Sequence, residues 1–309
     1  MNHLLSPHRV LLPTGGGIFV DLTTPAVIIS KMSFAGIKDH DDPQVIILPI
    51  PYGGTVSFGP SVRSGPERIL TASQNLEDYD EELLIPIDQL RLQTLPPLPI
   101  TARGPEDMVE RIATRVADLF DPGRLLITIG GEHTITIGVI RGIKRRIDRL
   151  SVIIFDGHDD LRSEYQASGY SHACVARRIS EEAPVVILGV RGISLLPESR
   201  PRGVEVLTPS ELRKGERWKG IIDELSDPVY LSIDLDVLDP ALMPAVGSPE
   251  PDGLSWHQLT TMMRYIIEKR EVVGGDVVEL APLPGLLTPD FIAARLIMKL
   301  IVYWVARSR

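Results

Sequence analysis

Residues 152–160 read VIIFDGHDD, so that four apolar residues run directly into three aspartates and a histidine. The same arrangement occurs at two other places, where LLITI at 125–129 precedes GGEHT and VYLSI at 229–233 precedes DLDVLDP. Apolar runs of this length, rich in β-branched residues, predict buried strands. Acidic groups crowded at the end of a buried strand cost several kcal/mol per ion unless a cation joins them. We therefore expect a pair of divalent metal ions at one edge of a sheet.

Apolar runs alternate with amphipathic stretches along most of the chain. The predicted strands are residues 45–50, 125–129, 152–155, 185–190, 204–207, 229–233 and 277–280. The predicted helices are residues 105–120, 134–150, 172–180 and 255–270. Continuous apolar strands joined by helices are typical of a parallel sheet with helices on both faces. The expected fold class is therefore α/β, with three α/β/α layers and a mostly parallel central sheet.

The two ends of the chain differ from this alternation. Residues 1–31 fit it poorly and are interpreted as an N-terminal extension: an oligomer-contacting arm, an extra strand pair, or residues before a true start at Met32. Residues 32–309 contain no long Pro/Gly/Ser linker and are expected to form a single domain. Near the C-terminus, Thr288 is the expected N-cap of a helix. That helix is apolar nearly all round, so it is either deeply packed or covered by a partner subunit.

Composition narrows the class of protein. The 309 residues are 43% hydrophobic and 24% charged, which is ordinary for a globular protein of the cytoplasm. The formal net charge of −9 argues against a nucleic-acid partner, which needs a basic face, and is compatible with a cationic substrate. The single cysteine, Cys174, excludes an internal disulfide and a thiolate zinc cluster. No segment resembles a membrane span, so we expect a cytoplasmic protein without a membrane partner.

The spacing within the clusters favours a metal site built on strand ends. Asp156, His158 and Asp160 are spaced by two, so in an extended segment they share one face. Asp234 and Asp236 repeat this spacing on another strand end. Carboxylates mixed with imidazole, without thiolate, favour hard or borderline metals such as Mn²⁺. Asp156 and Asp234 can each bridge two ions about 3.5–4 Å apart.

Several of these residues also have structural interpretations. His133 follows Gly130 and Gly131, whose missing side chains let the backbone approach its neighbours closely. Taken alone, His133 is more typical of a hydrogen-bonding histidine, and a single Asp-x-Asp is more typical of a turn or a helix cap. Three such clusters after three separate strands favour the metal interpretation instead. Asp159 is expected to point away from its neighbours and Asp239 to belong to a turn, so neither is a predicted ligand.

The three clusters resemble the signatures of the ureohydrolase family, the arginases and agmatinases. Similar motifs extend from about residue 45 to the C-terminus: GT at 54–55, FGP at 58–60, SGPERI at 64–69, SQNLEDYD at 73–80, PEPDGL at 249–254 and DVVE at 276–279. The segment at 73–80 is similar to agmatinase-type members. The resemblance implies an arginase-like fold, two Mn²⁺ ions, and a homo-oligomer that is a trimer or a hexamer.

The resemblance also implies a role for each site residue. One manganese ion would be held by His133, Asp156, Asp160 and Asp234, and the other by Asp156, His158, Asp234 and Asp236. Water activated by both ions would attack the central carbon of a guanidinium group held by Glu279. Asp160 would relay a proton to the departing nitrogen, and His172 matches a family histidine implicated in proton shuttling. Urea and a primary amine would then leave.

The loop at 161–170, LRSEYQASGY, bears on the far end of the substrate. Glu164 suits a substrate that carries only cationic groups. Arg162 suits a carboxylate, or forms a structural salt bridge with Glu164 or another acid. The asparagine that arginases place shortly after the ligand cluster is absent. We therefore expect agmatine, or an aminopropyl derivative of it, as the substrate in polyamine biosynthesis, with arginine or another guanidino acid as the alternative.

The sequence also departs from the family pattern, and Ala173 stands where the family often has glycine. Gly157 replaces the usual alanine, which is expected to loosen the backbone, and PLPG at 282–285 stands where agmatinases more often have PPYD. A non-catalytic, metal-binding regulatory homologue is the alternative from another class, although none of the six ligands is missing. A deacetylase-type hydrolase would need a pair of adjacent histidines, which the sequence lacks.

Overall fold

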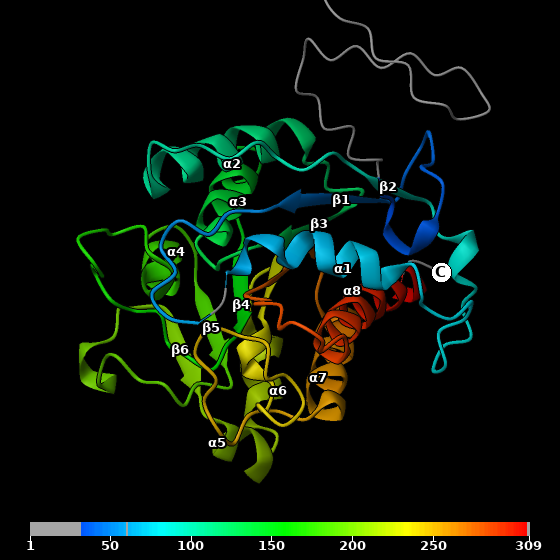
Figure 1. Ribbon diagram of the computed structural model, residues 1–309. Helices are drawn as coiled ribbons and strands as arrows, with labels where there is room; N and C mark the ends of the chain where they lie inside the picture. Colours follow the sequence, from blue (N-terminus) through cyan, green and yellow to red (C-terminus); the bar gives the residue numbers. More distant parts are fainter. Residues whose placement is uncertain (1–31, 60, 308–309) are drawn as a thin grey trace, which may run out of the picture. The chain divides into compact units, whose positions relative to one another are not determined.

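Eight strands form one sheet in the order β2-β1-β3-β8-β7-β4-β5-β6 in the computed structural model of the protein (Figure 1). The structure describes residues 32–59 and 61–307, and the predicted extension, residues 1–31, lies outside them. In sheet order the strands are β2 (Leu92–Thr94), β1 (Val45–Ile50), β3 (Leu125–Gly130), β8 (Val272–Val278), β7 (Val229–Asp234), β4 (Ser151–Phe155), β5 (Val185–Leu188) and β6 (Val204–Leu207). Every pairing between neighbouring strands is parallel, which confirms the predicted fold class.

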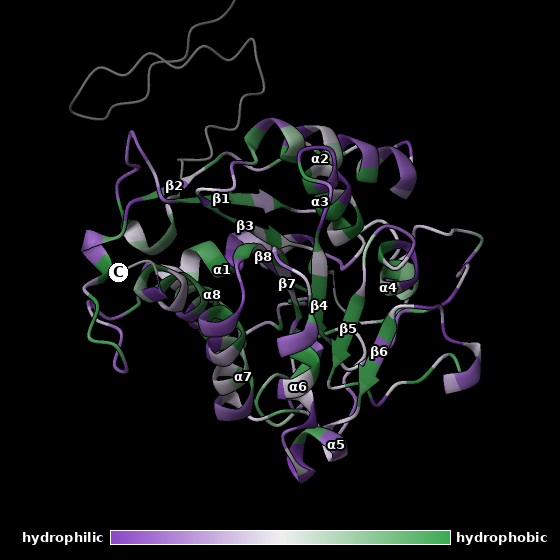
Figure 2. Ribbon diagram, turned by 180° about the vertical axis from the view of Figure 1, so that it is seen from behind, coloured by the Kyte–Doolittle hydropathy of each residue, from purple (hydrophilic) through white to green (hydrophobic). Residues whose placement is uncertain are grey.

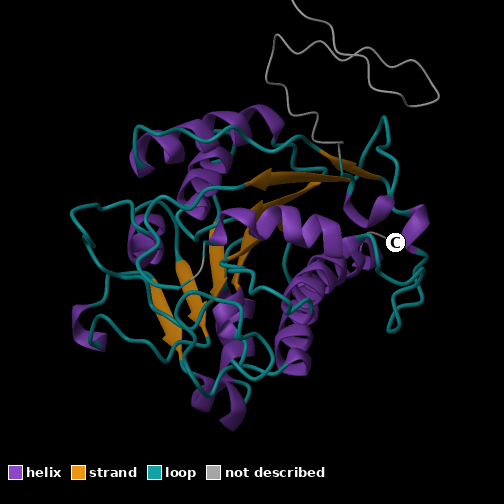
Figure 3. Cartoon of the chain, viewed as in Figure 1, coloured by secondary structure: helices purple, strands orange, loops and turns teal. Residues whose placement is uncertain are grey.

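Helices cover both faces of the sheet, which produces three layers (Figures 1 and 3). One face carries α2 (Pro105–Leu119), α3 (Ile135–Lys144) and α4 (Val175–Ile179). The other carries α1 (Gly65–Ser73), α5 (Pro209–Lys214), α6 (Arg217–Glu224), α7 (Trp256–Lys269) and α8 (Thr288–Arg307). Short 3-10 turns lie at Phe34–Gly36, Val62–Ser64, Ile87–Gln89, His172–Cys174, Pro197–Ser199 and Leu235–Val237.

The strands are apolar on both faces because both faces are covered. In β4, Val152 and Ile154 pack into the core on the side of α2, α3 and α4, whereas Ile153 and Phe155 pack into the core on the opposite side. Figure 2 shows the central strands as largely hydrophobic. Burying one such side chain contributes about 1.5–3 kcal/mol. This double burial explains why the strands read as continuous apolar runs instead of alternating ones.

Local sequence signals explain where the longer helices begin. Helix α7 starts with a capping box, in which the Ser255 side chain accepts a hydrogen bond from the Gln258 N–H and the Gln258 side chain accepts one from the Ser255 N–H. Helix α2 begins at Pro105, whose fixed φ suits the first helical position. The helices predicted at 105–120 and 255–270 therefore agree with the structure to within a residue at each end.

Two strands differ from the sequence prediction. The strand predicted at 277–280 is the end of β8, which begins at Val272 and passes through Gly274 and Gly275. These glycines interrupt the apolar run, so the pattern did not predict the first part of the strand. They are needed because a Cβ at either position would lie 2.8 Å from a carbonyl oxygen of a neighbouring strand. Strand β2 escaped prediction because only three residues pair with β1 at the edge of the sheet. Both misses concern pairing between distant segments, which a local pattern does not report.

Two predicted helices are shorter than expected. The helix predicted at 134–150 is α3, which ends at Lys144 because the chain turns back to enter β4 at Ser151. The helix predicted at 172–180 divides into a 3-10 turn and the short α4. Apolar residues continue at Ile147 and Leu150 past the end of α3, so periodicity alone overestimates the length of that helix.

The apolar C-terminal helix is packed within the chain. Helix α8 begins at Thr288 itself, one residue earlier than the predicted N-cap arrangement, and it packs against α1 and α7. Most of its side chains are buried, including Lys299, whose Nζ lies 2.8 Å from both Asp80 Oδ2 and Glu81 Oε1. Across the part of the chain that the structure describes, no helix has the length and apolar character needed to cross a membrane.

Candidate metal centre and active site

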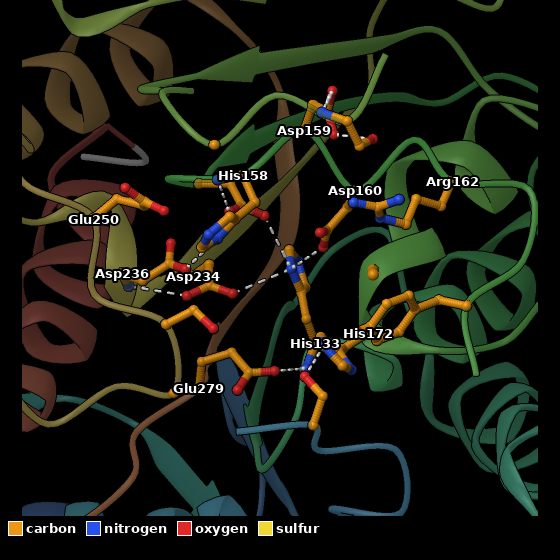
Figure 4. A pocket seen from close by; sticks show the side chains of 18 of the residues that line it. His133, His158, Asp159, Asp160, Arg162, His172, Asp234, Asp236, Glu250 and Glu279 are labelled. Atoms are coloured by element: carbon orange, nitrogen blue, oxygen red, sulfur yellow. Dashed lines mark hydrogen bonds and ion pairs between the residues drawn. The ribbon is translucent and has the colours of Figure 1, made fainter. Parts of the chain in front are cut away.

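The candidate site lies at the carboxyl ends of the four central strands. Strands β3, β8, β7 and β4 are neighbours in the sheet, and polar residues follow or end each of them. His133 follows β3, Glu279 follows β8, Asp234 ends β7 and Asp156 follows β4. Their side chains line one cavity of about 340 Å³ (Figure 4). A parallel sheet places its ligand site at this edge because all of its strands end there.

Three carboxylates surround one ring nitrogen of His133. Its Nδ1 atom lies 3.2 Å from Asp156 Oδ2, 3.3 Å from Asp160 Oδ2 and 3.3 Å from Asp234 Oδ2. Neither His133 Nδ1 nor Asp156 Oδ2 has a hydrogen-bond partner in the described part of the chain, although both atoms are buried. Buried polar atoms without such partners are rare and point to an ion or a ligand. One imidazole nitrogen and three carboxylate oxygens at this spacing fit a divalent cation.

A second group of ligand atoms adjoins the first and shares Asp156. Nδ1 of His158 lies 2.7 Å from Asp236 Oδ2 and 3.8 Å from Asp156 Oδ1. Main-chain groups hold these carboxylates in place: Asp236 Oδ1 accepts a hydrogen bond from Gly157 N–H at 2.8 Å, and Asp234 Oδ1 accepts one from Asp236 N–H at 2.9 Å. The structure therefore brings five of the six predicted ligands into two adjoining groups that could each hold a metal ion, and the sixth, Asp234, lies beside the first group (Figure 4).

The two groups concentrate negative charge in a largely buried part of the cavity. Burial and the neighbouring aspartates raise the pKa of Asp156 and of Asp234 well above the usual range. Burial alone would lower the pKa of His158, but the adjacent Asp236 outweighs it and raises that pKa to about 11. Burial likewise opposes the charged form of His133, whose pKa is nevertheless raised well above 6.5 by the carboxylates around it. Each of these four shifts favours added positive charge, which a metal ion supplies.

The backbone at the site adopts conformations that side chains rarely take. Asp160 and Glu279 have φ values of +44° and +66°, in the left-handed region. Glu279 is fixed on both sides, since its N–H donates to the carbonyl of Gly131 at 2.8 Å and its Oε1 accepts from His133 N–H at 2.6 Å. A Cβ on Gly131 would lie 1.9 Å from the Tyr52 carbonyl oxygen, which confirms the close approach predicted for the two glycines.

The other ring nitrogen of His133 contacts a buried hydrogen-bond network that the sequence did not reveal. Nε2 of His133 lies 3.0 Å from Ser232 Oγ, which donates to Asp276 Oδ1 at 2.6 Å. The hydroxyls of Thr136 and Tyr230 both donate to Asp276 Oδ2 at 2.9 Å. The Ser232 hydroxyl donates its single proton to Asp276, so its oxygen accepts a hydrogen bond from Nε2 of His133. The ring proton of His133 therefore lies on Nε2, and Nδ1 is available to bind a cation. The only signal in the sequence was an acid in the middle of an apolar strand.

His172 is oriented by a second network that the sequence also missed. Its Nδ1 lies 3.2 Å from Thr55 Oγ1 and its Nε2 lies 3.4 Å from Ser57 Oγ. Thr55 donates through its N–H and its hydroxyl to the carboxylate of buried Glu132, at 2.7 and 2.9 Å. Because the Thr55 hydroxyl donates to Glu132, it can accept a hydrogen bond from Nδ1 of His172, and a ring with its proton on Nδ1 has Nε2 available as a base. Both motifs, GT at 54–55 and GGEH at 130–133, were noted in the sequence, but the contact between them could not be predicted from it.

The two residues predicted to bind the far end of the substrate lie in different places. Arg162 lines the cavity, and its guanidinium carbon lies 5.6 Å from the ring centre of Tyr165. No ion pair of Arg162 is found within residues 32–59 and 61–307, so the salt bridge considered for it is not formed there. Glu164 is exposed and does not line the cavity, whereas Glu250 does. The segment PEPDGL at 249–254 was noted for its similarity to the family, but no role was predicted for Glu250.

Asp159 is turned away from the ligand groups, as predicted (Figure 4). Its Oδ2 accepts hydrogen bonds from the N–H groups of Ser194 and Leu195, at 2.7 and 3.0 Å, and its Oδ1 accepts one from the Ser194 hydroxyl at 2.5 Å. Asp239 caps a turn, also as predicted, since its Oδ1 accepts from Ala241 N–H at 3.0 Å. Both aspartates fix loops beside the cavity and leave the ligand groups to their neighbours.

Comparison with known proteins assigns the chain to a family. The sequence pattern of the arginase family matches residues 43–303, which include every residue that lines the cavity. N(1)-aminopropylagmatine ureohydrolase from Synechocystis sp. is 35% identical over 284 residues, which cover 88% of this chain and 93% of that protein. Agmatinase from Pyrococcus horikoshii is 33% identical over 255 residues, covering 79% and 85%.

A solved structure supports the same relationship. The agmatine ureohydrolase of Thermoplasma volcanium matches the fold with a TM-score of 0.81 at 28% identity, and the match covers 89% of this chain and 94% of that one. With a family match over most of its length and relatives more than 30% identical, this chain belongs to the arginase family.

Proposed function

We propose that this protein is a binuclear manganese hydrolase that cleaves the guanidino group of agmatine, or of a close derivative such as aminopropylagmatine, to urea and a primary amine. Agmatine would yield putrescine. The observation that carries the proposal is the pair of ligand groups that share Asp156, with the carboxylate of Glu279 lining the same cavity. The names of the relatives, an aminopropylagmatine ureohydrolase and an agmatinase, support this choice of substrate.

The donor set fits two manganese ions. His133, Asp156, Asp160 and Asp234 would hold one ion, and Asp156, His158, Asp234 and Asp236 would hold the other. Carboxylate oxygens with two imidazoles and no thiolate favour manganese over a structural zinc. When bound, two such cations lower the pKa of water and thereby supply a nucleophile near neutral pH.

Glu279 binds the guanidinium group in this proposal. Burial, together with Asp234 and Glu132, raises the pKa of Glu279 well above the usual range, so the site favours a positive partner for its carboxylate. A guanidinium group, with a pKa above about 12, stays cationic in water and presents paired N–H donors. Oε1 of Glu279 already accepts from His133 N–H, which orients the carboxylate and leaves Oε2 for the substrate.

Asp160 and His172 handle the proton that the reaction moves. When the oxygen of water bonds to the guanidino carbon, the bond from that carbon to the chain nitrogen breaks, and the departing nitrogen gains a proton. Asp160 lines the cavity and is the more exposed of the carboxylates around His133, so it can take the proton from water and deliver it to the nitrogen. His172, held by Thr55 with Nε2 beside Ser57, exchanges protons with solvent at the rim.

The proposal extends to the setting of the enzyme. We propose a cytoplasmic protein of polyamine biosynthesis that assembles as a homo-oligomer, a trimer or a hexamer. An arginase or another guanidino-acid ureohydrolase is the second candidate, and the observation that favours it is Arg162, a cavity-lining cation without an ion pair in the described residues. A non-catalytic regulatory homologue is the candidate from another class.

Manganese-dependent urea release from a panel of substrates tests the proposal. Metal-stripped protein is reloaded with Mn²⁺ and assayed with agmatine, aminopropylagmatine, arginine and 4-guanidinobutyrate. We expect urea from the first two, with a higher kcat/KM than from the guanidino acids. A preference for arginine or guanidinobutyrate would establish the second candidate. Absence of urea from all four substrates would leave only the non-catalytic homologue.

Metal removal should make the stability of the protein fall as the pH rises. Asp156, Asp234 and Glu279 have pKa values that are higher in the folded state than in the unfolded state. Each of them therefore stabilises the folded protein fully below the usual carboxyl pKa, and this stabilisation is lost as the pH rises through the folded-state pKa. The contribution of His158, with a folded pKa of about 11, is full below its unfolded pKa and declines above it. The pKa of Asp236 is lowered in the folded protein, so the stabilisation that this residue contributes is lost only at acidic pH.

The melting temperature of chelator-treated protein should therefore decrease between about pH 6 and about pH 9, while manganese-loaded protein changes much less over the same range. Differential scanning calorimetry of both forms measures the difference directly. Parallel curves for the two forms would contradict the assignment of these carboxylates to a metal centre.

A further inference from the structure

Glu250 carries a carboxylate at the rim of the cavity that the catalytic roles above do not use. It is half-buried and lies on the same side of the site as His158 and Asp236 (Figure 4). Within residues 32–59 and 61–307, its carboxylate forms no hydrogen bond or ion pair with the protein. A ligand in the cavity can therefore reach this charge without displacing another cation from it.

The main chain at Glu250 is fixed relative to the ligand groups. Arg191 donates to the carbonyl oxygen of Glu250 through Nε at 3.1 Å and Nη2 at 2.8 Å, and the same Nη2 donates to the carbonyl oxygen of Asp236 at 2.7 Å. Pro249 and Pro251 flank Glu250 and restrict its backbone further. One guanidinium thus joins the loop of Glu250 to the loop of a candidate metal ligand, so the distance between Glu250 and the reacting carbon is set by the fold.

Apolar side chains line the rim together with Glu250. Phe58 and Ile193 line the cavity although they are 71% and 53% exposed. Gly59 approaches the loop of Glu250 so closely that a Cβ on it would lie 3.0 Å from the carbonyl oxygen of Gly247. The loops that carry Phe58 and Glu250 therefore lie against each other. Large exposed apolar side chains beside a polar cavity suit the methylene chain of a ligand.

Arg162 lies on the opposite side of the ligand groups from Glu250 (Figure 4). The rim therefore presents two opposite charges at two separate positions. A substrate whose far end is an ammonium is attracted to Glu250 and repelled by Arg162, and a substrate whose far end is a carboxylate experiences the reverse. The guanidinium end is common to both kinds of substrate, so it does not discriminate between them.

On the basis of the guanidine hydrolysis proposed above, we propose that Glu250 is the specificity-determining residue that receives the distal ammonium group of the substrate. The class it selects is that of ω-guanidino amines, in which a methylene chain separates a guanidinium from an ammonium group. Glu279 binds the guanidinium, the methylene chain passes Phe58 and Ile193, and Glu250 binds the ammonium. Glu164, the acid that the sequence suggested for this task, contributes little because it lies outside the cavity.

Two substrates that differ only at the far end isolate this interaction. Agmatine ends in an ammonium group, and pentylguanidine replaces that group with a methyl of similar size. In Glu250→Gln, kcat/KM for agmatine should fall about tenfold, mainly through KM, because a hydrogen bond to a charged group is lost. The kcat/KM for pentylguanidine should stay unchanged. Glu250→Asp, which keeps the charge on a shorter side chain, should recover part of the preference for agmatine.

Glu164→Gln is the matched control, since it removes the same charge from an exposed residue outside the cavity. It should leave both substrates unaffected. The inference is overturned if Glu250→Gln has no effect on agmatine, if it affects both substrates equally, or if Glu164→Gln has the same effect. These outcomes presuppose urea from the wild-type protein. If the wild type hydrolyses neither substrate, the proposed function itself fails and the role of Glu250 falls with it.

Discussion

Replacement of Asp234 by alanine is expected to abolish metal binding and urea formation together. Asp234 Oδ2 lies 3.3 Å from His133 Nδ1, and its Oδ1 accepts from the N–H of Asp236, so the carboxylate stands between the two ligand groups. In the proposed site Asp234 would hold both ions, so its loss would remove one oxygen ligand from each and leave the remaining aspartates to repel one another. Turnover should fall by more than about 10³-fold, because metal ions contribute several kcal/mol to such reactions.

Metal content measured by mass spectrometry, alongside calorimetric titration of metal-free protein with Mn²⁺, checks this expectation independently of activity. Asp159→Asn is the matched control, because Asp159 is a buried aspartate on the same segment as Asp156 whose carboxylate faces Ser194 and Leu195. The control should bind two manganese ions per chain. Full metal occupancy in Asp234→Ala would refute the bridging role.

Replacement of Glu279 by glutamine is expected to spare the metal ions and to weaken the binding of the guanidinium group. The amide oxygen can still accept from His133 N–H, so the orientation of His133 is preserved. The substituted side chain lacks the negative charge and the second acceptor that a guanidinium needs. With about 1.5–3 kcal/mol for each charged hydrogen bond, kcat/KM should fall roughly 100-fold.

Urea kinetics combined with metal analysis separates the two possible roles of Glu279. The expected result is normal manganese content with a large loss in kcat/KM for agmatine and for pentylguanidine alike, because both carry the guanidinium. Glu250→Gln differs from it by sparing pentylguanidine, so the pair of variants distinguishes the two ends of the substrate. Loss of manganese from Glu279→Gln would instead place this residue among the metal ligands.

Much of the fold could be predicted from local sequence because its strands are buried on both faces. The run VIIF at 152–155 is apolar throughout, since Val152 and Ile154 face one helical layer while Ile153 and Phe155 face the other. Only Val277 and Val278 of strand β8 were predicted, because Gly274 and Gly275 are explained by the carbonyl oxygens of neighbouring strands and not by their own hydrophobicity. Glycines chosen for close approach leave no periodic signal.

The candidate site divides in the same way. The spacing of Asp156, His158 and Asp160 indicated a common face, and the structure places these residues with their partners from the other two clusters. The networks that orient the site were not predictable. Thr136 and Tyr230 lie 140 and 46 residues from Asp276 along the chain, yet strand pairing brings their hydroxyl groups to 2.9 Å from its carboxylate. Such contacts depend on the order of strands in the sheet.

Local sequence was enough to predict most of the strands, the helices that alternate with them, and the chemical types of the candidate ligands that follow three of the strands. These properties are local, because burial and ligand chemistry act on neighbouring residues. The acid that lines the rim of the cavity, in contrast, could be identified only once the packing of the loops was known. Glu164 is near the ligands in sequence but exposed, whereas Glu250 is distant in sequence and is brought to the rim by Arg191. Packing between loops fixes that choice, and no spacing along the chain encodes it.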